Sequence, residues 1–504
     1  MYASLFYCPK LYVKKGGMTM ETGKHNVSGN IEEDIAYLNE ALGVEKSFDV
    51  IRLDVIYAGR KMALFFIDGF VKDDILHYLM KILLELKPGD LEPDPLEKLL
   101  KTYIPYVEVD AQNDLDKLVE SVLAGPTVLV VDGMSSSIVI DARTYPVRGP
   151  QEPDMERVVR GARDGFVETI VFNTALTRRR VRDRTLRMEY MSVGRRSKTD
   201  IVISYIEDLA NDRFVDEIKK SLSDIDTDGL PMGEKTVDEF ITGDYWNPYP
   251  VLRYTERPDT AAVHLYEGHV IVFVDGTPSA LIAPATFWHH LQHAEEYRNK
   301  PIVGAYLRLV RYLGVWASLF ILPLWYFFAM NPGYLPPSLS FIGPSGYGVI
   351  PLIIQFLIIE VGLDMLRMAA IHTPSSLATA LGLVAALMIG GVAVDVGLFS
   401  NEVILYLSVA AIGTFATPSY ELSLANRIVR LVLLLATAIF GLPGLVVGAT
   451  VHLLMLVNMK SLGIPYMWPF IPFSYRALRD VIIRIPIPLK NRRPKPFHTK
   501  DPDR

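Results

Sequence analysis

Residues 348–367 read GVIPLIIQFLIIEVGLDMLR. This stretch is apolar enough to enter a lipid bilayer, yet it carries Glu360, Asp364 and Arg367. Steps of four and three residues place these three charges on one face of a helix. A charge inside a membrane is costly and usually faces a cavity, a pore or a partner helix. Two interpretations stay open: an ion pair that pins neighbouring helices together, or a direct role in the passage of ions or solutes.

Other apolar segments surround this stretch and extend the predicted helical domain over residues 301–475. Residues 312–330 are apolar over a length that spans a bilayer, and residues 403–417 form another apolar run. The runs 428–440 and 445–459 are each short for a full crossing. These two runs predict either two thin spans or a re-entrant hairpin.

A stripe of small residues marks a further predicted span over residues 377–399. Gly382, Ala386 and Gly390 recur at intervals of four, which permits close packing against another helix. Asp395 lies near the far end of the same span. We therefore expect this span to pack between helices or between protomers.

The distribution of basic residues predicts the orientation of these spans. Cytoplasmic loops of membrane proteins carry an excess of lysine and arginine. The basic positions are Arg308, Arg311, Arg367, Arg427, Arg430 and the tail over residues 476–504. This pattern requires four or six crossings, with both termini in the cytosol.

The part of the chain before these spans has the pattern of a soluble α/β protein. Residues 1–30 contain no apolar signal-peptide core and are predicted to be a disordered leader. Short apolar strands alternate with helical patterns over residues 31–150 and 151–300, which predicts two small cytosolic α/β subdomains. The net charge of −6 gives no general signature of nucleic-acid binding, and the single cysteine, Cys8, excludes an intrachain disulfide.

A weak internal repeat occurs three times in this soluble part. A turn glycine, a buried strand and Asp-Gly follow one another in residues 59–69, 125–133 and 268–276. In the second and third copies another strand follows, and Asp-Gly between two strands is a hairpin signal. Turn chemistry accounts for these aspartates better than catalysis or metal binding does.

The second subdomain begins with many arginines, on a helix predicted over residues 155–182. An RNA-binding interpretation lacks a recognition module or an aromatic platform. Acidic residues are interleaved with the arginines, which favours a solvated face or a subunit interface. The arginines are Arg157, Arg160, Arg163, Arg178, Arg179 and Arg180.

Residues 288–298, WHHLQHAEEYR, contain the one pattern typical of a metal site. His289, His293 and Glu296 have helical spacing, but the order lacks the His-Glu-x-x-His of metalloproteases. A linker helix before the membrane is the preferred interpretation. The sequence has no P-loop, nucleophile elbow or paired cysteines, so no enzymatic activity, cofactor or metal is predicted.

Several motifs in order resemble those of the GerA spore germination family, in its A-subunit branch. They include VRGARDGFVE at 159–168, ATPSYEL at 416–422 and GIPY at 463–466, together with the charges of the opening stretch. The resemblance covers about residues 31–490. It implies a multi-pass protein of the spore inner membrane, with no nucleic-acid partner, that acts with other germination membrane proteins.

The resemblance also implies a homo-oligomeric ring that conducts ions. The function predicted is a channel subunit that promotes or amplifies the release of monovalent cations during germination. The alternatives are a non-conducting membrane scaffold that organises germinant receptors, and the A subunit of a nutrient germinant receptor. The candidate ion pathway comprises Glu360, Asp364, Arg367, Asp395 and Glu421. The candidate subunit interface comprises Arg157, Arg160, Arg163, Arg178, Arg179, Arg180, Gly382, Ala386 and Gly390.

Overall fold

A computed structural model describes most of the chain. It covers residues 25–104, 108–143, 156–344, 346, 349–372, 392–490 and 492–503. The chain divides into two compact units, the first ending at Thr144 and the second comprising Lys46–Asp49 and the chain from Tyr145 onward. Gly382, Ala386 and Gly390 lie outside the described residues, so the predicted stripe stays a prediction.

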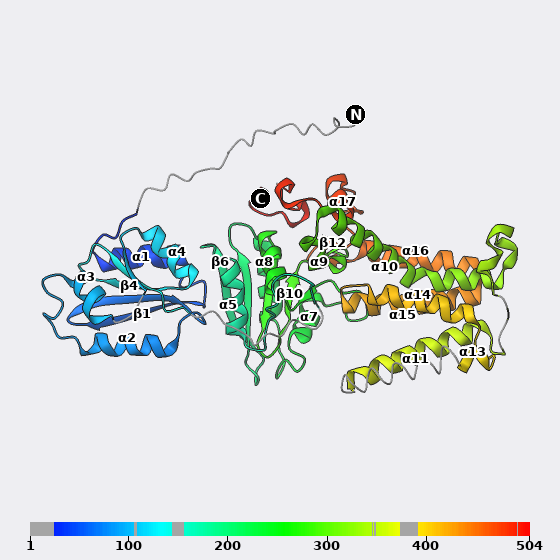
Figure 1. The fold of residues 1–504 in the computed structure, drawn as a ribbon, viewed down its shortest axis with the longest axis horizontal. Helices are drawn as coiled ribbons and strands as arrows, with labels where there is room; N and C mark the ends of the chain where they lie inside the picture. Colours follow the sequence, from blue (N-terminus) through cyan, green and yellow to red (C-terminus); the bar gives the residue numbers. More distant parts are fainter. Residues whose placement is uncertain are drawn as a thin grey trace, which may run out of the picture. The chain divides into compact units, whose positions relative to one another are not determined.

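The first unit is one antiparallel sheet covered by helices on both faces. The sheet order is β1-β2-β4-β5-β3. Figure 1 shows α1 and α4 on one face and α2 on the other. Because side chains alternate along a strand, Met62, Leu64 and Phe66 of β2 pack against Leu79 and Leu83 of α2. The elements are α1 (Ile31–Leu42), β1 (Val50–Tyr57), β2 (Arg60–Ile67), α2 (Asp73–Glu85), α3 (Pro95–Lys98), the π-helical turn η1 (Leu99–Tyr103), β3 (Val109–Gln112), α4 (Leu115–Ala124), β4 (Thr127–Val131) and β5 (Ser137–Ile140).

The second unit begins with a sheet of the same design, in the order β6-β7-β9-β10-β8. One face packs against α6 and α7 through residues such as Ile203 and Ile218. The other face packs against α5 and α8 through residues such as Phe273 and Leu265. The elements are α5 (Ile170–Arg180), β6 (Leu186–Val193), β7 (Thr199–Ile206), α6 (Asp212–Ser223), α7 (Glu234–Thr242), β8 (Arg253–Thr255), α8 (Pro258–Tyr266), β9 (Val270–Val274) and β10 (Ala280–Ala283).

The internal repeat is therefore a repeat of a whole fold. Helices and strands follow one another in the same order in both units, and the predicted hairpins β4–β5 and β9–β10 are confirmed. Each Asp-Gly has a second role besides the turn. The carboxylate of Asp132 accepts a hydrogen bond from the Ile31 amide, and that of Asp275 accepts one from Ile170. Each aspartate thus satisfies the first amide of its unit's leading helix.

Helices dominate the rest of the second unit. Two described helices, α10 and α15, are long and apolar enough to cross a membrane, while α14 and α16 are apolar but shorter. Helix α15 begins at Tyr420, eight residues before the predicted start of that run, so it exceeds the length expected for a thin span. The helices are α9 (Ala294–Arg298), α10 (Pro301–Met330), α11 (Leu352–His372), α13 (Ala393–Asp395), α14 (Asn401–Phe415), α15 (Tyr420–Phe440) and α16 (Leu442–Asn458), with 3-10 turns η3 (Pro332–Tyr334) and η4 (Pro337–Ile342).

The chain after α16 folds back onto the sheet of the second unit. Leu462, Ile464 and Phe497 belong to the same apolar core as α6. The Lys500 amide donates to the carbonyl of Leu209 over 3.1 Å. The elements are β11 (Lys460–Ser461), β12 (Ile464–Pro465), α17 (Tyr475–Ile482) and the 3-10 turns η6 (Ile487–Leu489) and η7 (Lys495–Phe497).

Two predicted helices are wrong. Within the predicted helix over residues 155–182, only α5 is helical. The chain before it passes through Gly161 at φ +132°, a conformation that interrupts a helix, and the Phe166 amide bonds the Glu256 carbonyl instead. The predicted linker helix over 288–298 is a 3-10 turn, η2 (His289–Leu291), followed by the separate short helix α9.

Candidate functional site: a buried ion-pair network between helices

The central feature of the helical region is the carboxylate of Glu360 on α11. Glu360 is buried, with 1% of its surface exposed. The Nε of Arg427 on α15 donates to Glu360 Oε2 over 3.0 Å, and Arg430 Nη2 lies 2.7 Å from Oε1. Because a lone buried charge is very costly, one carboxylate held by two guanidinium groups is the arrangement that makes its burial tolerable.

Asp364 completes the charge balance one helical turn later. Its carboxylate forms an ion pair with Nη1 of Arg427, so Arg427 bridges both acidic side chains of α11. The side chain of Asp364 is 44% exposed, whereas that of Arg427 is 8% exposed. Two carboxylates and two guanidinium groups therefore give a network with no net charge.

Arg430 extends the network to two further helices. Its Nη1 donates to the Ser318 carbonyl of α10 over 2.8 Å and to Thr414 Oγ1 of α14 over 3.3 Å. Four helices thus meet at one guanidinium group. The arrangement can hold α10, α11, α14 and α15 together, and any movement of α15 would uncover the acidic face of α11.

The third charged residue of the opening stretch, Arg367, is not part of this network. Arg367 lies on the same helix, but the structure describes no ion pair between it and Glu360 or Asp364. Its guanidinium carbon lies 5.7 Å from the ring centre of Phe415 and 5.5 Å from that of Tyr420. Arg427 and Arg430, which the sequence interpretation placed on the cytosolic side, lie inside α15 and hold the carboxylates.

Two other candidates for the ion pathway lie apart from this network. Asp395 is exposed on α13. Glu421 lies in the first turn of α15, where its Oε2 accepts a hydrogen bond from Ser419 Oγ over 3.0 Å. Sequence reasoning overlooked the roles of Arg427 and Arg430. Their spacing of three residues in an apolar helix was the signal that would have found them.

The arginines proposed for a subunit interface differ in their exposure to solvent. Arg178 is 1% exposed and its Nε donates to Asp49 Oδ2 over 2.9 Å, so this side chain has no access to a second subunit. Arg157, Arg160, Arg163 and Arg179 are exposed, and Arg180 pairs with Asp164.

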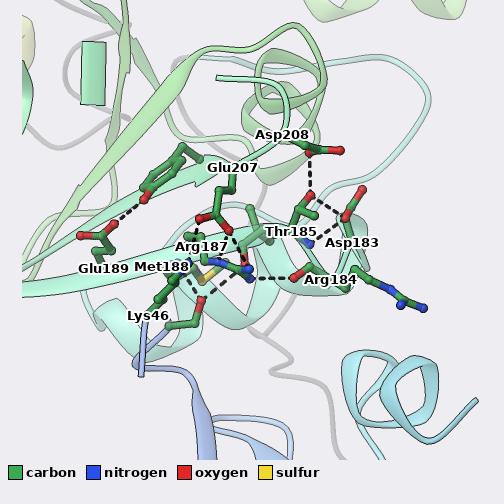
Figure 2. Close-up of polar contacts among 12 residues, drawn as sticks. Lys46, Asp183, Arg184, Thr185, Arg187, Met188, Glu189, Glu207 and Asp208 are labelled. Atoms are coloured by element: carbon green, nitrogen blue, oxygen red, sulfur yellow. Dashed lines mark hydrogen bonds and ion pairs between the residues drawn. The ribbon is translucent and has the colours of Figure 1, made fainter. Parts of the chain in front are cut away.

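The neighbouring basic residues also have acidic partners in their own unit (Figure 2). Arg187 donates to Glu207 Oε2 over 2.9 Å and to the carbonyl of Arg184 over 2.7 Å. Lys46 approaches the other oxygen of Glu207 at 3.0 Å. Thr185 Oγ1 lies within hydrogen-bond distance of two carboxylates, 2.8 Å from Asp183 Oδ1 and 2.7 Å from Asp208 Oδ1, and its one hydrogen can be donated to either. This part of the basic segment is therefore an internal network of paired charges.

The triplet with metal-ligand spacing does not form a site. His289 Nδ1 accepts from the Thr286 amide, and Glu296 pairs with Arg308 and Arg311 at the start of α10. Among the described residues, no group of three or more His, Cys, Asp or Glu side chains has the geometry to hold a metal.

A cluster of buried histidines lies between β9, α8 and the chain after β10. The ring centres of His264 and His269 are 5.0 Å apart, and those of His269 and His289 are 5.2 Å apart. The ring centre of Phe497 lies 4.3 Å from that of His269, with the two ring planes tilted by 53°. Burial lowers the pKa of His269 to about 4, and burial likewise lowers the pKa of His264 and His289. These rings are neutral at pH 7.

The second copy of the α/β fold is followed by apolar helices with a buried charge network, and two of the described helices are long and apolar enough to cross a membrane. The chain belongs to the GerA family, because the model described as Bacillus/Clostridium GerA spore germination protein matches residues 36–496. It is 46% identical to stage V sporulation protein AF of Bacillus subtilis (strain 168), over 95% of this chain and 97% of that protein.

Two further proteins are similar to this chain. It is 32% identical to the uncharacterized membrane protein YfkQ of Bacillus subtilis (strain 168), over 85% of this chain and 84% of that protein. The crystal structure of the N-terminal domain of the A subunit of the Bacillus megaterium spore germinant receptor GerK3 matches with a TM-score of 0.42 and 29% identity, over 52% of this chain and 98% of that domain.

Proposed function

We propose that this protein is a multi-pass subunit of the spore inner membrane that assembles into an oligomeric channel for monovalent cations. It acts with other germination membrane proteins and promotes ion release, without an enzymatic step. Both termini lie on the cytosolic side, and α11 supplies the acidic side chains of the pathway. The observation that carries the proposal is the buried Glu360 carboxylate between Arg427 and Arg430.

The ion-pair network provides the closed state of this channel. Acidic side chains in a pore concentrate cations and replace part of their hydration shell. With Arg427 bound to Glu360 and Asp364, the charge of both carboxylates is compensated, and that of Glu360 is also buried. A movement of α15 away from α11 releases two carboxylates one helical turn apart. Opening is therefore coupled to helix movement, because the same arginines tie α15 to α10 and α14.

Ion flux from liposomes that contain the purified protein tests this proposal. We expect Arg427→Gln to increase potassium efflux, because Asp364 loses its partner and Glu360 retains only Arg430. We expect Glu360→Gln to decrease efflux. Lys300→Gln, at an exposed position just before α10, removes a charge outside the network and should match the wild type. If the wild type and Arg427→Gln, both folded and inserted, conduct no ions, the channel proposal is wrong.

One observation favours the scaffold alternative. The four charges of the network compensate one another, and Arg430 uses two further bonds to join α10 and α14. An ion-pair network whose only role is packing would be arranged in the same way. The flux experiment separates the two functions, because a scaffold does not conduct in any of the variants.

A further inference from the structure

A cavity of about 360 Å³ lies among four apolar helices, and it adjoins the ion-pair network at Thr414. It is lined by side chains of α10, α11, α14 and α15 together with His293. Its charged lining residues are Arg311 and Arg367. Among the described residues that line it, none is an aspartate or glutamate. We propose that this cavity binds a phosphate group, supplied either by the headgroup of an anionic phospholipid or by a free phosphate ion.

Arg367 is the first reason for a phosphate ligand. Its guanidinium lies over the rings of Phe415 and Tyr420, and no carboxylate within the described chain pairs with it. Its Nη1 atom is buried and has no hydrogen-bond partner among the residues that the structure describes. A buried donor without a partner is unfavourable, and a planar guanidinium matches two oxygens of a phosphate. The two rings flank the guanidinium, and its Nη1 donor is left for a ligand.

Arg311 is the second cation of the lining. It donates to the Leu291 carbonyl over 3.0 Å and pairs with Glu296. Glu296 also binds Arg308 at 2.7 Å, so one carboxylate serves two guanidinium groups and a positive charge remains. Burial and the nearby Arg311 lower the pKa of His293 to about 4, so this ring is neutral at pH 7. The positive potential of the cavity therefore comes from its two arginines and not from His293.

The position of the cavity suits a lipid phosphate. Arg311 directly precedes the apolar run at 312–330, which places it at the level where a bilayer core ends. Pro418, Tyr420 and Ser423 bring the start of α15 to the same cavity, so the positive end of a 21-residue helix also faces the ligand. Aromatic residues such as Tyr420 are common at this depth.

The test measures binding to the delipidated full-length protein in neutral detergent. Phosphatidylglycerol, phosphatidylcholine or inorganic phosphate is added, and the melting temperature and the lipid retained in native mass spectra are recorded. We expect phosphatidylglycerol to raise the melting temperature. We expect Arg367→Gln to weaken that binding at least about tenfold, which is the usual effect of losing one charge-assisted hydrogen bond. Arg476→Gln, at an exposed position in α17, removes the same charge outside the cavity and should bind normally.

The outcomes separate the two sources of phosphate. A shift with phosphatidylglycerol only identifies a lipid site, and an Arg367-dependent shift with inorganic phosphate identifies a free-anion site. Ala416→Glu places a carboxylate in the cavity from an exposed lining position, so it should block binding even if Arg367→Gln does not fold. Equal binding by the wild type, Arg367→Gln and Ala416→Glu overturns the proposal. The result does not depend on whether the protein conducts ions.

Discussion

At the scale of single residues, Glu360 and Asp364 differ far more than their shared helix face suggests. Glu360 is 1% exposed and lies between two arginines. The side chain of Asp364 is 44% exposed and contacts one of them. Desolvation, rather than charge alone, therefore determines how much each carboxylate contributes to the stability of the helical region.

We expect Glu360→Gln to destabilise the protein by about 3–5 kcal/mol, because two buried guanidinium groups lose their counter-charge. Asp364→Asn removes the same charge one turn away at a half-exposed position, and we expect a loss of at most about 1 kcal/mol. Thermal unfolding of both variants in one detergent measures the difference. Similar losses in the two variants would show that the Glu360 network does not stabilise the helices as described.

The buried histidines predict how stability depends on pH. Burial lowers the pKa of His269 to about 4, whereas an unfolded histidine titrates near 6.5. The unfolded state therefore binds more protons below pH 6.5, so the stabilisation is complete above that pH and is lost as the pH falls towards 4. Between pH 7.5 and 5.5 we expect this residue to cost about 1.4 kcal/mol.

Denaturant unfolding at the two pH values measures this loss. His269→Asn can still donate to the Pro284 carbonyl that His269 Nδ1 contacts at 2.8 Å, and it cannot titrate. This variant should show a smaller pH dependence than the wild type. His498→Gln, at an exposed position, is the control and should retain the wild-type dependence. An unchanged slope in His269→Asn would rule out this residue as the source.

At the scale of elements, α10 and α14 approach each other through glycine. A Cβ at Gly413 would overlap the carbonyl oxygen of Gly314, which is backbone and cannot turn aside. Gly413→Ala should therefore cost about 1–3 kcal/mol through overpacking. Gly362→Ala on α11 meets no atom within 4 Å, and it should be neutral or slightly stabilising because alanine favours helix.

The melting temperatures of these two alanine variants test the predicted close approach. Both variants add one methyl group to a helix of the same region. The difference between their melting temperatures therefore reports on the close approach of α10 and α14. A neutral result for Gly413→Ala would show that α10 and α14 can separate without cost. Loss of stability in Gly362→Ala would point instead to a general intolerance of the helical region.

The contrast between local and distant contacts explains what the sequence could predict. The hairpins β4–β5 and β9–β10 were predicted because a turn and its two strands are neighbours in the chain. The partners of Glu360 could not be predicted in this way, because Arg427 lies 67 residues further along the chain. The nearest basic residue on the same helical face is Arg367, which the structure places outside the network. The periodicity and spacing of residues identify a charged helix face, but the packing of the helices determines which residues that face contacts.

At the scale of the whole molecule, the same α/β fold occurs twice, and the second copy is followed by further helices. Helices α10 to α16 extend the second unit, and the chain after them returns to that unit's own sheet. The sequence predicted residues 476–504 as a basic tail, and in the structure these residues include the buried Phe497. The tail therefore contributes to the core of the second unit.

Phe497 should anchor this returning segment. Its ring is fully buried, lies in the core with α6 and is 4.3 Å from the ring centre of His269. Phe497→Ala leaves a cavity and should cost about 3–5 kcal/mol, and the segment beyond Lys490 should then become sensitive to trypsin. Leu489→Ala, at a side chain that is 69% exposed, is the matched control and should retain wild-type resistance. Limited proteolysis followed by mass spectrometry locates the cleavage sites. If Phe497→Ala stays as resistant as the wild type, contacts such as Lys490 with Glu267 and Lys500 with Asp212 are sufficient to hold the segment.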